Sequence, residues 1–466
     1  MIIMEELVEK AIEYGLSRGC NYIDARLQIV RGTRIRIRNG LIQSITPSVS
    51  RGIGVRVLIE NSWGFSSTTR VDRDSVRKCV DIAIKNALLV SSDVSQTDIA
   101  NTPAVREEIL INEANKVSVT PIETKMKVLL EIDKAIRKVG EDIKSTISYV
   151  DQYEEKVIST SEGSTVRLED SWLFLTVLAY AHEAGLIQSY RTRFGALGGF
   201  DKLWKIDYEN IGKEAAEKAR NLLKAETTPA GKFTVIMDNE LAGLLAHEAF
   251  GHAAEADSVM NGSSILIGRL GQKVASELVT IVDDATYREG FGSYKYDDEG
   301  VKGQRKLIVH KGILKGFLSS KETSCKLEIP LTGNARAESF GHPPIVRMSN
   351  TFFEKGDLSF EELIEDVKYG IYAKGGRGGQ VSPIDGVFQF TAQEAYLIER
   401  GEITRPLRDF CMSGFILSTL KRISGIGKDF QLSPGFCGKN GQSVRVSLGG
   451  PHLRIEGITV GGQRWI

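Results

Sequence analysis

Two hydrophobic periods alternate along the N-terminal part of the chain, one typical of helices and the other of strands. Residues 5–17 place apolar side chains at helical spacing, whereas residues 25–30 and 34–38 alternate between apolar and polar. The dipeptide Asn39-Gly40 separates residues 34–38 from the next strand-like segment, residues 41–45, and favours a tight hairpin turn. We therefore expect a helix followed by an antiparallel hairpin, with the arginines of residues 34–38 on its solvated face.

Three further helices are predicted before residue 227. The first follows Asp72 and carries its apolar face on residues 76–88. The second begins at a capping box, Thr120-Pro121-Ile122-Glu123, and runs to about residue 139. The third covers residues 212–223, after alternating segments typical of strands. The pattern predicts an N-terminal α/β domain with helices on a mixed or antiparallel sheet.

A short break containing proline and glycine, residues 227–231, separates two parts of the chain that differ in residue pattern. We place the domain boundary there, which gives residues 1–227 and residues 228–466. The second part starts with a strand, residues 233–238, and a helix from about Asn239. Beyond residue 261 it is rich in glycine and strand-like segments, with one helix at residues 360–368. We expect an α+β protein whose C-terminal domain is a curved or barrel-like β structure.

Composition excludes several classes of partner. Lys plus Arg number 60 and Asp plus Glu also number 60, so no basic excess favours nucleic acid or an anionic membrane. No stretch reaches the roughly 18 consecutive apolar residues that a membrane helix needs, and the N-terminus lacks a signal-peptide pattern. The five cysteines form no CxxC pair, which indicates reduced thiols. We expect a cytoplasmic protein.

The residues that indicate chemistry are His247 and His252, which lie five apart with Glu248 between them. Five residues of a regular α-helix turn through about 500°, which leaves the two imidazoles about 140° apart. A π-helical or unwound turn at or near Gly251 would bring both to one side. The spacing thus predicts a distorted helix that binds a metal ion.

A catalytic zinc ion usually takes three protein ligands and leaves one position open. From the residues alone, the third ligand is Glu255, Asp257 or Cys437, the last of which lies in a glycine-rich segment. The alternative interpretation is that the two histidines are unrelated helix residues and that Cys437 is an inert buried thiol.

Several ordered motifs accompany the histidine pair. They are residues 297–301 (DDEGV), 332–336 (TGNAR), 347–351 (RMSNT), 393–399 (QEAYLIE) and 437–442 (CGKNGQ). With these motifs the chain resembles the TldD/PmbA family, and in particular its TldD branch, most strongly from about residue 228 to the end. The resemblance implies a zinc peptidase with His247, His252 and Cys437 as Zn²⁺ ligands and Glu248 as the general base. It also implies small or unfolded peptides as substrates, and a dimer with an identical chain or with a PmbA-type paralogue.

Arg336 and Arg347 are candidates for binding a peptide carboxylate, since arginine pairs with carboxylates through two parallel hydrogen bonds. The alternative for each is a structural ion pair. Gln442 is a further candidate substrate contact. Two competing functions remain open: a non-catalytic subunit that binds or presents peptides, and a hydrolase with Cys437 as its nucleophile. Removal of metal separates the last of these from a zinc peptidase.

Overall fold

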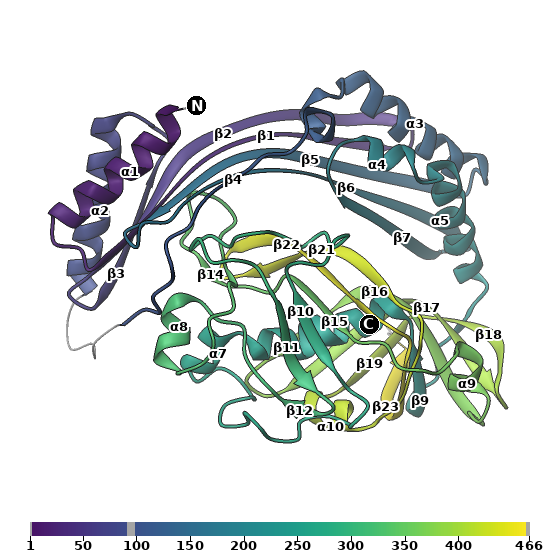
Figure 1. Ribbon diagram of the computed structural model, residues 1–466. Coiled ribbons are helices and arrows are strands. Elements are labelled where there is room, and N and C mark those ends of the chain that lie inside the picture. Colours follow the sequence, from purple (N-terminus) through teal and green to yellow (C-terminus); the bar gives the residue numbers. More distant parts are fainter. Residues whose placement is uncertain (1, 91–97, 463–466) are drawn as a thin grey trace.

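The computed structural model describes residues 2–90 and 98–462 and has a mixed α+β fold whose C-terminal part is rich in strands (Figure 1). The N-terminal part is a seven-stranded sheet in the order β3-β2-β1-β5-β6-β4, with β7 paired to β6. Its neighbouring strands are antiparallel except for β4 and β6. The strands are β1 (Tyr22–Arg38), β2 (Leu41–Ile59), β3 (Ser62–Thr68), β4 (Arg106–Ile109), β5 (Ile143–Thr160), β6 (Thr165–Glu183) and β7 (Leu186–Leu197).

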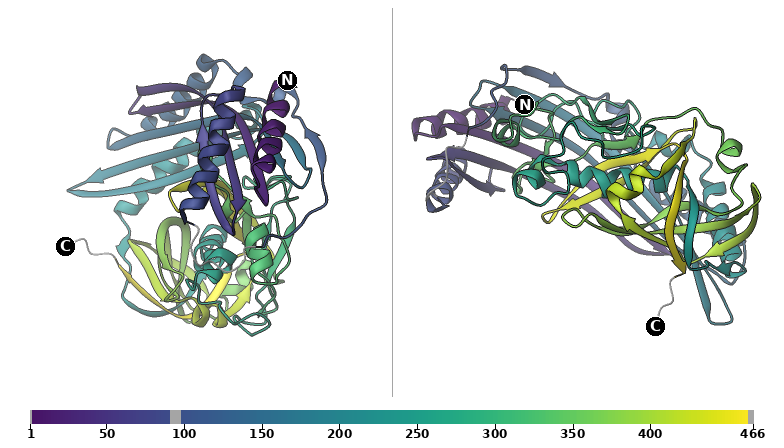
Figure 2. Two further views of the ribbon diagram at one scale, coloured as in Figure 1. Left: turned by 90° about the vertical axis from the view of Figure 1, so that its left-hand side faces the viewer. Right: turned by 90° about the horizontal axis from the view of Figure 1, so that it is seen from below.

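The predicted hairpin is confirmed. Strands β1 and β2 pair from Arg38 and Leu41 onward, and both turn residues have positive φ angles, 51° for Asn39 and 78° for Gly40. The long strands bend into an arch over the C-terminal part, and Figure 2 shows the same stacking from two further sides.

Helices cover both ends of the arch on its outer side (Figure 1). At one end α1 (Ile2–Ser17) and α2 (Arg73–Val90) form a core with β1 and β2. At the other, α3 (Ile122–Lys138), α4 (Asp201–Trp204) and α5 (Tyr208–Leu223) form a second core with β5 and β6. The predicted capping box is wrong: Pro121 is the N-cap of α3, and Thr120 instead ends the short 3-10 turn Val117–Val119.

Five strands of the C-terminal part close into a barrel. Their pairing runs β16-β9-β23-β19-β17 and returns from β17 to β16, while β18, β8 and β20 extend it. The barrel strands are β9 (Gly231–Met237), β16 (Tyr369–Ser382), β17 (Val387–Glu399), β19 (Phe410–Phe415) and β23 (Leu453–Gly462). The extending strands are β8 (Glu226–Thr227), β18 (Glu402–Arg408) and β20 (Ile423–Ile426). The expected β-rich, barrel-like C-terminal part is confirmed.

A six-stranded sheet lies beside the barrel in the order β12-β11-β10-β15-β22-β21. Its strands are β10 (Ile281–Asp284), β11 (Arg305–His310), β12 (Ile313–Leu314), β15 (Asn350–Phe353), β21 (Gln431–Lys439) and β22 (Gln442–Gly450). The short helix α6 (Asn239–Leu244) packs against β22 and β21 on one side and β16 on the other. The remaining short elements are β13 (Ala335–Arg336), β14 (Ile345–Val346), α7 (Ala256–Met260), α8 (Lys321–Lys326), α9 (Phe360–Ile364) and α10 (Ile416–Lys421).

Buried ion pairs join the arch to the C-terminal part. Nη2 of Arg56 lies 2.6 Å from Oδ2 of Asp24 on the neighbouring strand and 2.8 Å from Oε1 of Glu299 below the arch. Lys156 of β5 pairs in the same way with Asp298. The boundary between residues 227 and 228 stays a prediction. Across residues 2–90 and 98–462, every helix is too short or too polar to traverse a lipid bilayer.

Candidate metal centre

The segment that carries the two histidines contains a π-helix, in which His247 lies and which His252 directly follows. Strand β9 ends at Met237, and the carboxylate of the next residue, Asp238, accepts a hydrogen bond from the Leu241 N–H at 2.9 Å and so caps α6. After α6 the helix widens over Leu245–Gly251, where the N–H of His252 donates to the carbonyl of His247, five residues back. The imidazoles therefore lie on one side, with ring centroids 5.3 Å apart and planes at 82°. The distortion that the spacing predicted is present.

Gly251 is required in this helix because it lacks a side chain, not because its backbone is unusually free. Its φ and ψ angles, −57° and −49°, are ordinary helical values that any residue adopts. A Cβ atom at this position would lie 2.0 Å from Sδ of Met348. The distortion near Gly251 thus makes no use of the backbone freedom of glycine, and a side chain is excluded here because Met348 packs directly against the backbone.

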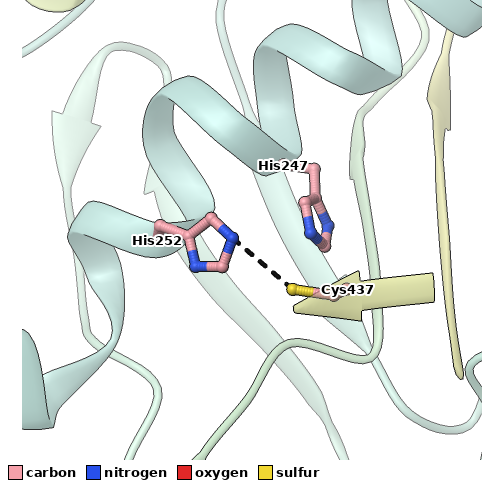
Figure 3. Close-up of side chains that lie close together, drawn as sticks. All are labelled: His247, His252 and Cys437. Carbon is pink, nitrogen blue, oxygen red and sulfur yellow. Dashed lines mark hydrogen bonds between the residues drawn. The ribbon is translucent and has the colours of Figure 1, made fainter. Parts of the chain in front are cut away.

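Cys437 completes a group of three metal-ligating side chains, as Figure 3 shows. Its Sγ lies 3.4 Å from Nε2 of His252, and the ligand atoms of His247, His252 and Cys437 all lie within 4.8 Å of one another. Two ligands of a tetrahedral zinc ion, at about 2.0–2.1 Å for nitrogen and 2.3 Å for sulfur, are roughly 3.5 Å apart. Among the described residues, no other three His, Cys, Asp or Glu side chains bring their ligand atoms together in a group of this kind.

Burial and charge also fit a cation. His247 is 1% exposed, and its Nδ1 has no hydrogen-bond partner among the described residues. Buried polar atoms are normally hydrogen-bonded, so a nitrogen without a partner is suited to binding a cation. Burial acts to raise the pKa of Cys437, but the charges of His247 and His252 outweigh it and lower that pKa to about 4. Two imidazoles and a thiolate are a donor set that zinc prefers.

Glu248 lies at the mouth of this group. Its Oε2 is 3.7 Å from Nε2 of His252, and its side chain is 30% exposed, whereas His247 behind it is buried. The opening is a cavity of about 470 Å³, lined further by Gln380 and Val381 of β16 and by Lys439 of β21. A carboxylate here has access both to solvent and to the ligand group.

Glu255 and Asp257, the other two candidates for the third ligand, make other contacts. Oε2 of Glu255 lies 2.9 Å from Nδ1 of His252, so Glu255 contacts the back of a ligand rather than joining the group. Asp257 pairs with Nζ of Lys439 at 2.7 Å, and that ammonium also contacts Glu255 at 3.0 Å. Among the described residues, Cys437 is therefore the one of the three candidates whose ligand atom joins those of His247 and His252.

Arg347 organises the strand that carries Cys437. Its side chain is fully buried, donates to the carbonyl of Cys437, and lies 3.3 Å from the carbonyl of Gln442 on the paired strand. No sequence signal indicated this role. Gln442 is also buried, its amide donating to the Pro343 carbonyl at 3.0 Å and accepting from the Glu338 N–H at 3.1 Å. Contact of either residue with substrate stays a prediction.

Arg336 does not line the opening beside the histidines. It lines a large cavity under the arch whose walls include none of His247, His252 and Cys437. Its guanidinium donates to the Met348 carbonyl at 2.6 Å and stacks on the ring of Tyr294. The three predicted substrate contacts thus lie outside the opening beside Glu248, while the predicted metal ligands are brought together.

Comparison with known proteins identifies the family. The domain models of the PmbA/TldA metallopeptidases match the chain in order: domain 1 at residues 23–87, the central domain at 115–223 and the C-terminal domain at 230–462. The chain belongs to the PmbA/TldD family. The resemblance stated from the sequence motifs is confirmed.

Relatives in the PmbA/TldD family match along nearly the whole chain. A metalloprotease of Methanocaldococcus jannaschii is 43% identical over 452 residues, which cover 96% of this chain and 98% of that protein. A zinc metalloprotease TldD homologue of Saccharolobus solfataricus is 33% identical and covers 98% of this chain and 100% of its own. The names of these relatives support a metalloprotease.

Solved structures share the fold. A protein of Thermotoga maritima described as a candidate modulator of a DNA gyrase superposes with a TM-score of 0.81 at 25% identity, covering 98% of this chain and 100% of its own. TldE from Thermococcus kodakarensis superposes with a TM-score of 0.79 at 19% identity, covering 99% and 100%. The second likeness is evidence for the fold alone.

Proposed function

We propose that the protein is a zinc-dependent peptidase that hydrolyses small or unfolded peptides, with Glu248 as its general base. The observation that carries the proposal is the convergence of His247, His252 and Cys437 beside the solvent-accessible carboxylate of Glu248. The name of the zinc metalloprotease relative supports the same metal.

The three proposed zinc ligands come from two elements of the fold. His247 and His252 come from adjacent turns of one helix, and Cys437 reaches them from β21 in a distant part of the sequence. When bound, a zinc ion supplies Lewis-acid chemistry, since it lowers the pKa of water and polarises a carbonyl. The burial of His247 and Cys437 keeps bulk water away from the ligand side of the site.

Glu248 would move the protons. Its carboxylate accepts a proton from the attacking water and returns it to the amine nitrogen that leaves as the peptide bond breaks. This role needs a carboxylate that reaches both the ligand group and the substrate. The position of Glu248 at the mouth, partly exposed and 3.7 Å from His252, meets that need.

One observation favours a second function. Burial acts to raise the pKa of Cys437, but His247 and His252 have the larger effect and lower it to about 4. A thiolate beside an imidazolium is the arrangement of a cysteine nucleophile. Cys437 is only 4% exposed, however, and such a hydrolase has no use for Glu248. A non-catalytic subunit that presents peptides likewise leaves Glu248 without a role.

Metal removal discriminates between these functions. Purified protein is assayed for bound metal and for hydrolysis of an unfolded peptide, before and after dialysis against a chelator, and again after zinc is restored. We expect bound zinc, loss of hydrolysis on dialysis and recovery with zinc. Hydrolysis that survives complete metal removal, and that a thiol-alkylating reagent abolishes, would support the cysteine hydrolase instead.

The dimer and its location also remain proposals. We expect the chain to act as a dimer, with itself or with a metal-free paralogue of the PmbA type, in the cytoplasm. Light scattering of the purified chain, alone and mixed with such a paralogue from the same cell, tests the first point. A monomer under both conditions would contradict it.

A further inference from the structure

A second cavity lies between the arch and the six-stranded sheet, and it is larger than the opening beside Glu248. Its volume is about 1240 Å³, against about 470 Å³ for the mouth of the metal centre. Its roof is the concave face of β1, β5 and β6. Its floor is formed by residues 285–303 and by the hairpin of β21 and β22. Figure 1 shows this hairpin beneath the arch. It is large enough for a ligand of peptide size.

One wall of this cavity is aromatic. Trp172 and Phe174 of β6 face Phe436 of β21, with ring centroids 5.6 Å and 5.1 Å apart. Phe436 is 43% exposed, which is unusual for a phenylalanine and places its ring in the cavity. Since successive residues of a strand face opposite sides, the next residue, Cys437, points to the histidines instead. The cavity and the metal centre thus lie on opposite faces of the same strand.

The basic side chains of the cavity are less fully paired than its acidic ones. Arg336 is 8% exposed, and no described carboxylate lies within 4.0 Å of its guanidinium. The same holds among the described residues for five basic side chains nearer the rim: Arg34, Arg36, Arg288, Lys295 and Lys302.

The acidic side chains are already in use. Asp170 pairs with Arg445, and Asp298 pairs with Lys156. The three acids that lack a basic partner accept hydrogen bonds from the protein: Glu107 from Tyr296, Glu338 from the Ser443 N–H, and Asp297 from the N–H groups of Val301 and Ala335. Among the described residues that line the cavity, six of the eight basic side chains therefore lack a carboxylate partner, against three of the seven acidic ones, so a ligand meets an excess of unpaired positive charge beside aromatic surface.

We infer that this cavity binds an organic anion of peptide size, with its carboxylate on Arg336 and its apolar part against Trp172 and Phe436. A buried guanidinium stacked on Tyr294 at 4.9 Å and lacking a protein carboxylate is suited to that group. A peptide that ends in an apolar residue has this chemistry. The site is separate from the metal centre and does not depend on hydrolysis.

The probe is N-acetyl-Ala-Ala-Phe with a free C-terminal carboxylate, and its matched partner is the same peptide as the C-terminal amide. Both are titrated into the zinc-loaded protein by calorimetry, and Trp172 fluorescence reports occupancy of the cavity. We expect the free acid to bind about ten-fold more tightly than the amide, because only the acid pairs with Arg336. In Trp172→Phe the binding heat persists and the fluorescence change is lost.

Variants place the site. Arg336→Gln is expected to weaken binding of the free acid about ten-fold and to leave the amide unchanged, while Arg336→Lys, which keeps the charge, retains part of the affinity. Arg36→Gln, at the exposed rim, lowers the affinity a few-fold and carries the test if Arg336→Gln does not fold. Arg405→Gln, an exposed arginine paired with Glu226 outside the cavity, is the matched control and changes nothing.

Three outcomes would overturn the inference. Equal binding of acid and amide excludes a carboxylate site. Binding that Cys437→Ser abolishes and Arg336→Gln leaves intact assigns the peptide to the metal centre. Phenyl phosphate that binds, and loses affinity in Arg336→Gln, while the peptide acid does not bind at all assigns the cavity to phosphate ligands. None of these results bears on whether the protein hydrolyses peptides, because hydrolysis is tested by metal removal.

Discussion

Oε2 of Glu255 lies 2.9 Å from Nδ1 of His252, on the ring edge opposite the nitrogen that faces Cys437. Glu255 is fully buried and is itself held by Nζ of Lys439 at 3.0 Å. A carboxylate behind a histidine ligand fixes the tautomer and the orientation of its ring. The histidine is thereby held with Nε2 directed at the ligand group before any ion binds.

Replacing this carboxylate should weaken the metal site without removing a ligand. We expect Glu255→Gln to lower zinc affinity about ten-fold, measured by competition with a chelator of known affinity. Asp257→Asn is the matched control, because Asp257 shares Lys439 with Glu255 but does not contact the ring. Equal zinc affinity in Glu255→Gln and the parent protein would exclude the positioning role.

Arg347 should affect both stability and the metal site, since it donates to the carbonyls of Cys437 and Gln442 on two paired strands. Arg347→Met removes two hydrogen bonds to buried carbonyls, and we expect a loss of about 2 kcal/mol in the free energy of unfolding together with weaker zinc binding. Denaturant unfolding and the chelator titration measure the two effects. The exposed Arg405→Met should change neither, and an Arg347→Met protein that matches it would contradict this account.

Gly251 and Met348 should be energetically coupled. A methyl group on Gly251 would lie 2.0 Å from Sδ of Met348, so Gly251→Ala is expected to destabilise the fold by about 1–3 kcal/mol through overpacking. Met348→Ala opens space for that methyl group. In a double-mutant cycle the two substitutions together should therefore cost clearly less than the sum of their separate effects. Additive effects would show that the two residues do not crowd each other.

The thiol of Cys437 should be ionised at neutral pH in zinc-free protein. Burial acts to raise its pKa, but His247 and His252 lower it to about 4, well below the ordinary value of about 8.5. Because the pKa is lowered by folding, the thiolate stabilises the fold fully above about pH 8.5, and this contribution is lost as pH falls toward about 4. The thiolate absorbance of the wild type minus that of Cys437→Ser should be constant from about pH 6 to pH 8. An increase centred near pH 8.5 would contradict the pairing.

The sequence predicted what short-range patterns control. The β1–β2 hairpin follows from alternating residues around Asn39-Gly40, and the π-helix follows from two histidines spaced five apart. The capping box at Thr120 failed because a neighbouring 3-10 turn, Val117–Val119, uses that residue as its end. Local pattern alone could not decide between two overlapping turns.

Long-range packing decided the rest of the site. From the residues alone Glu255 was as good a third ligand as Cys437, since it follows His252 by three positions. Only the placement of β21 beside the π-helix shows that the thiol joins the ligand group and the carboxylate contacts the back of the ring. The role of Arg347 likewise depends on a strand about 90 residues away in sequence.

The most direct test of the central claim is the zinc content and peptide hydrolysis of Glu248→Gln, measured in parallel with Glu277→Gln, an exposed glutamate that pairs with Lys273. Glutamine keeps the size of Glu248 but cannot accept the proton, and Glu248 is not among the three ligands. We expect Glu248→Gln to bind zinc as the wild type does and to lose hydrolysis by about 10²–10⁴-fold, while Glu277→Gln retains both. Full hydrolysis by Glu248→Gln, or a wild-type protein that hydrolyses peptides without bound metal, would contradict the account.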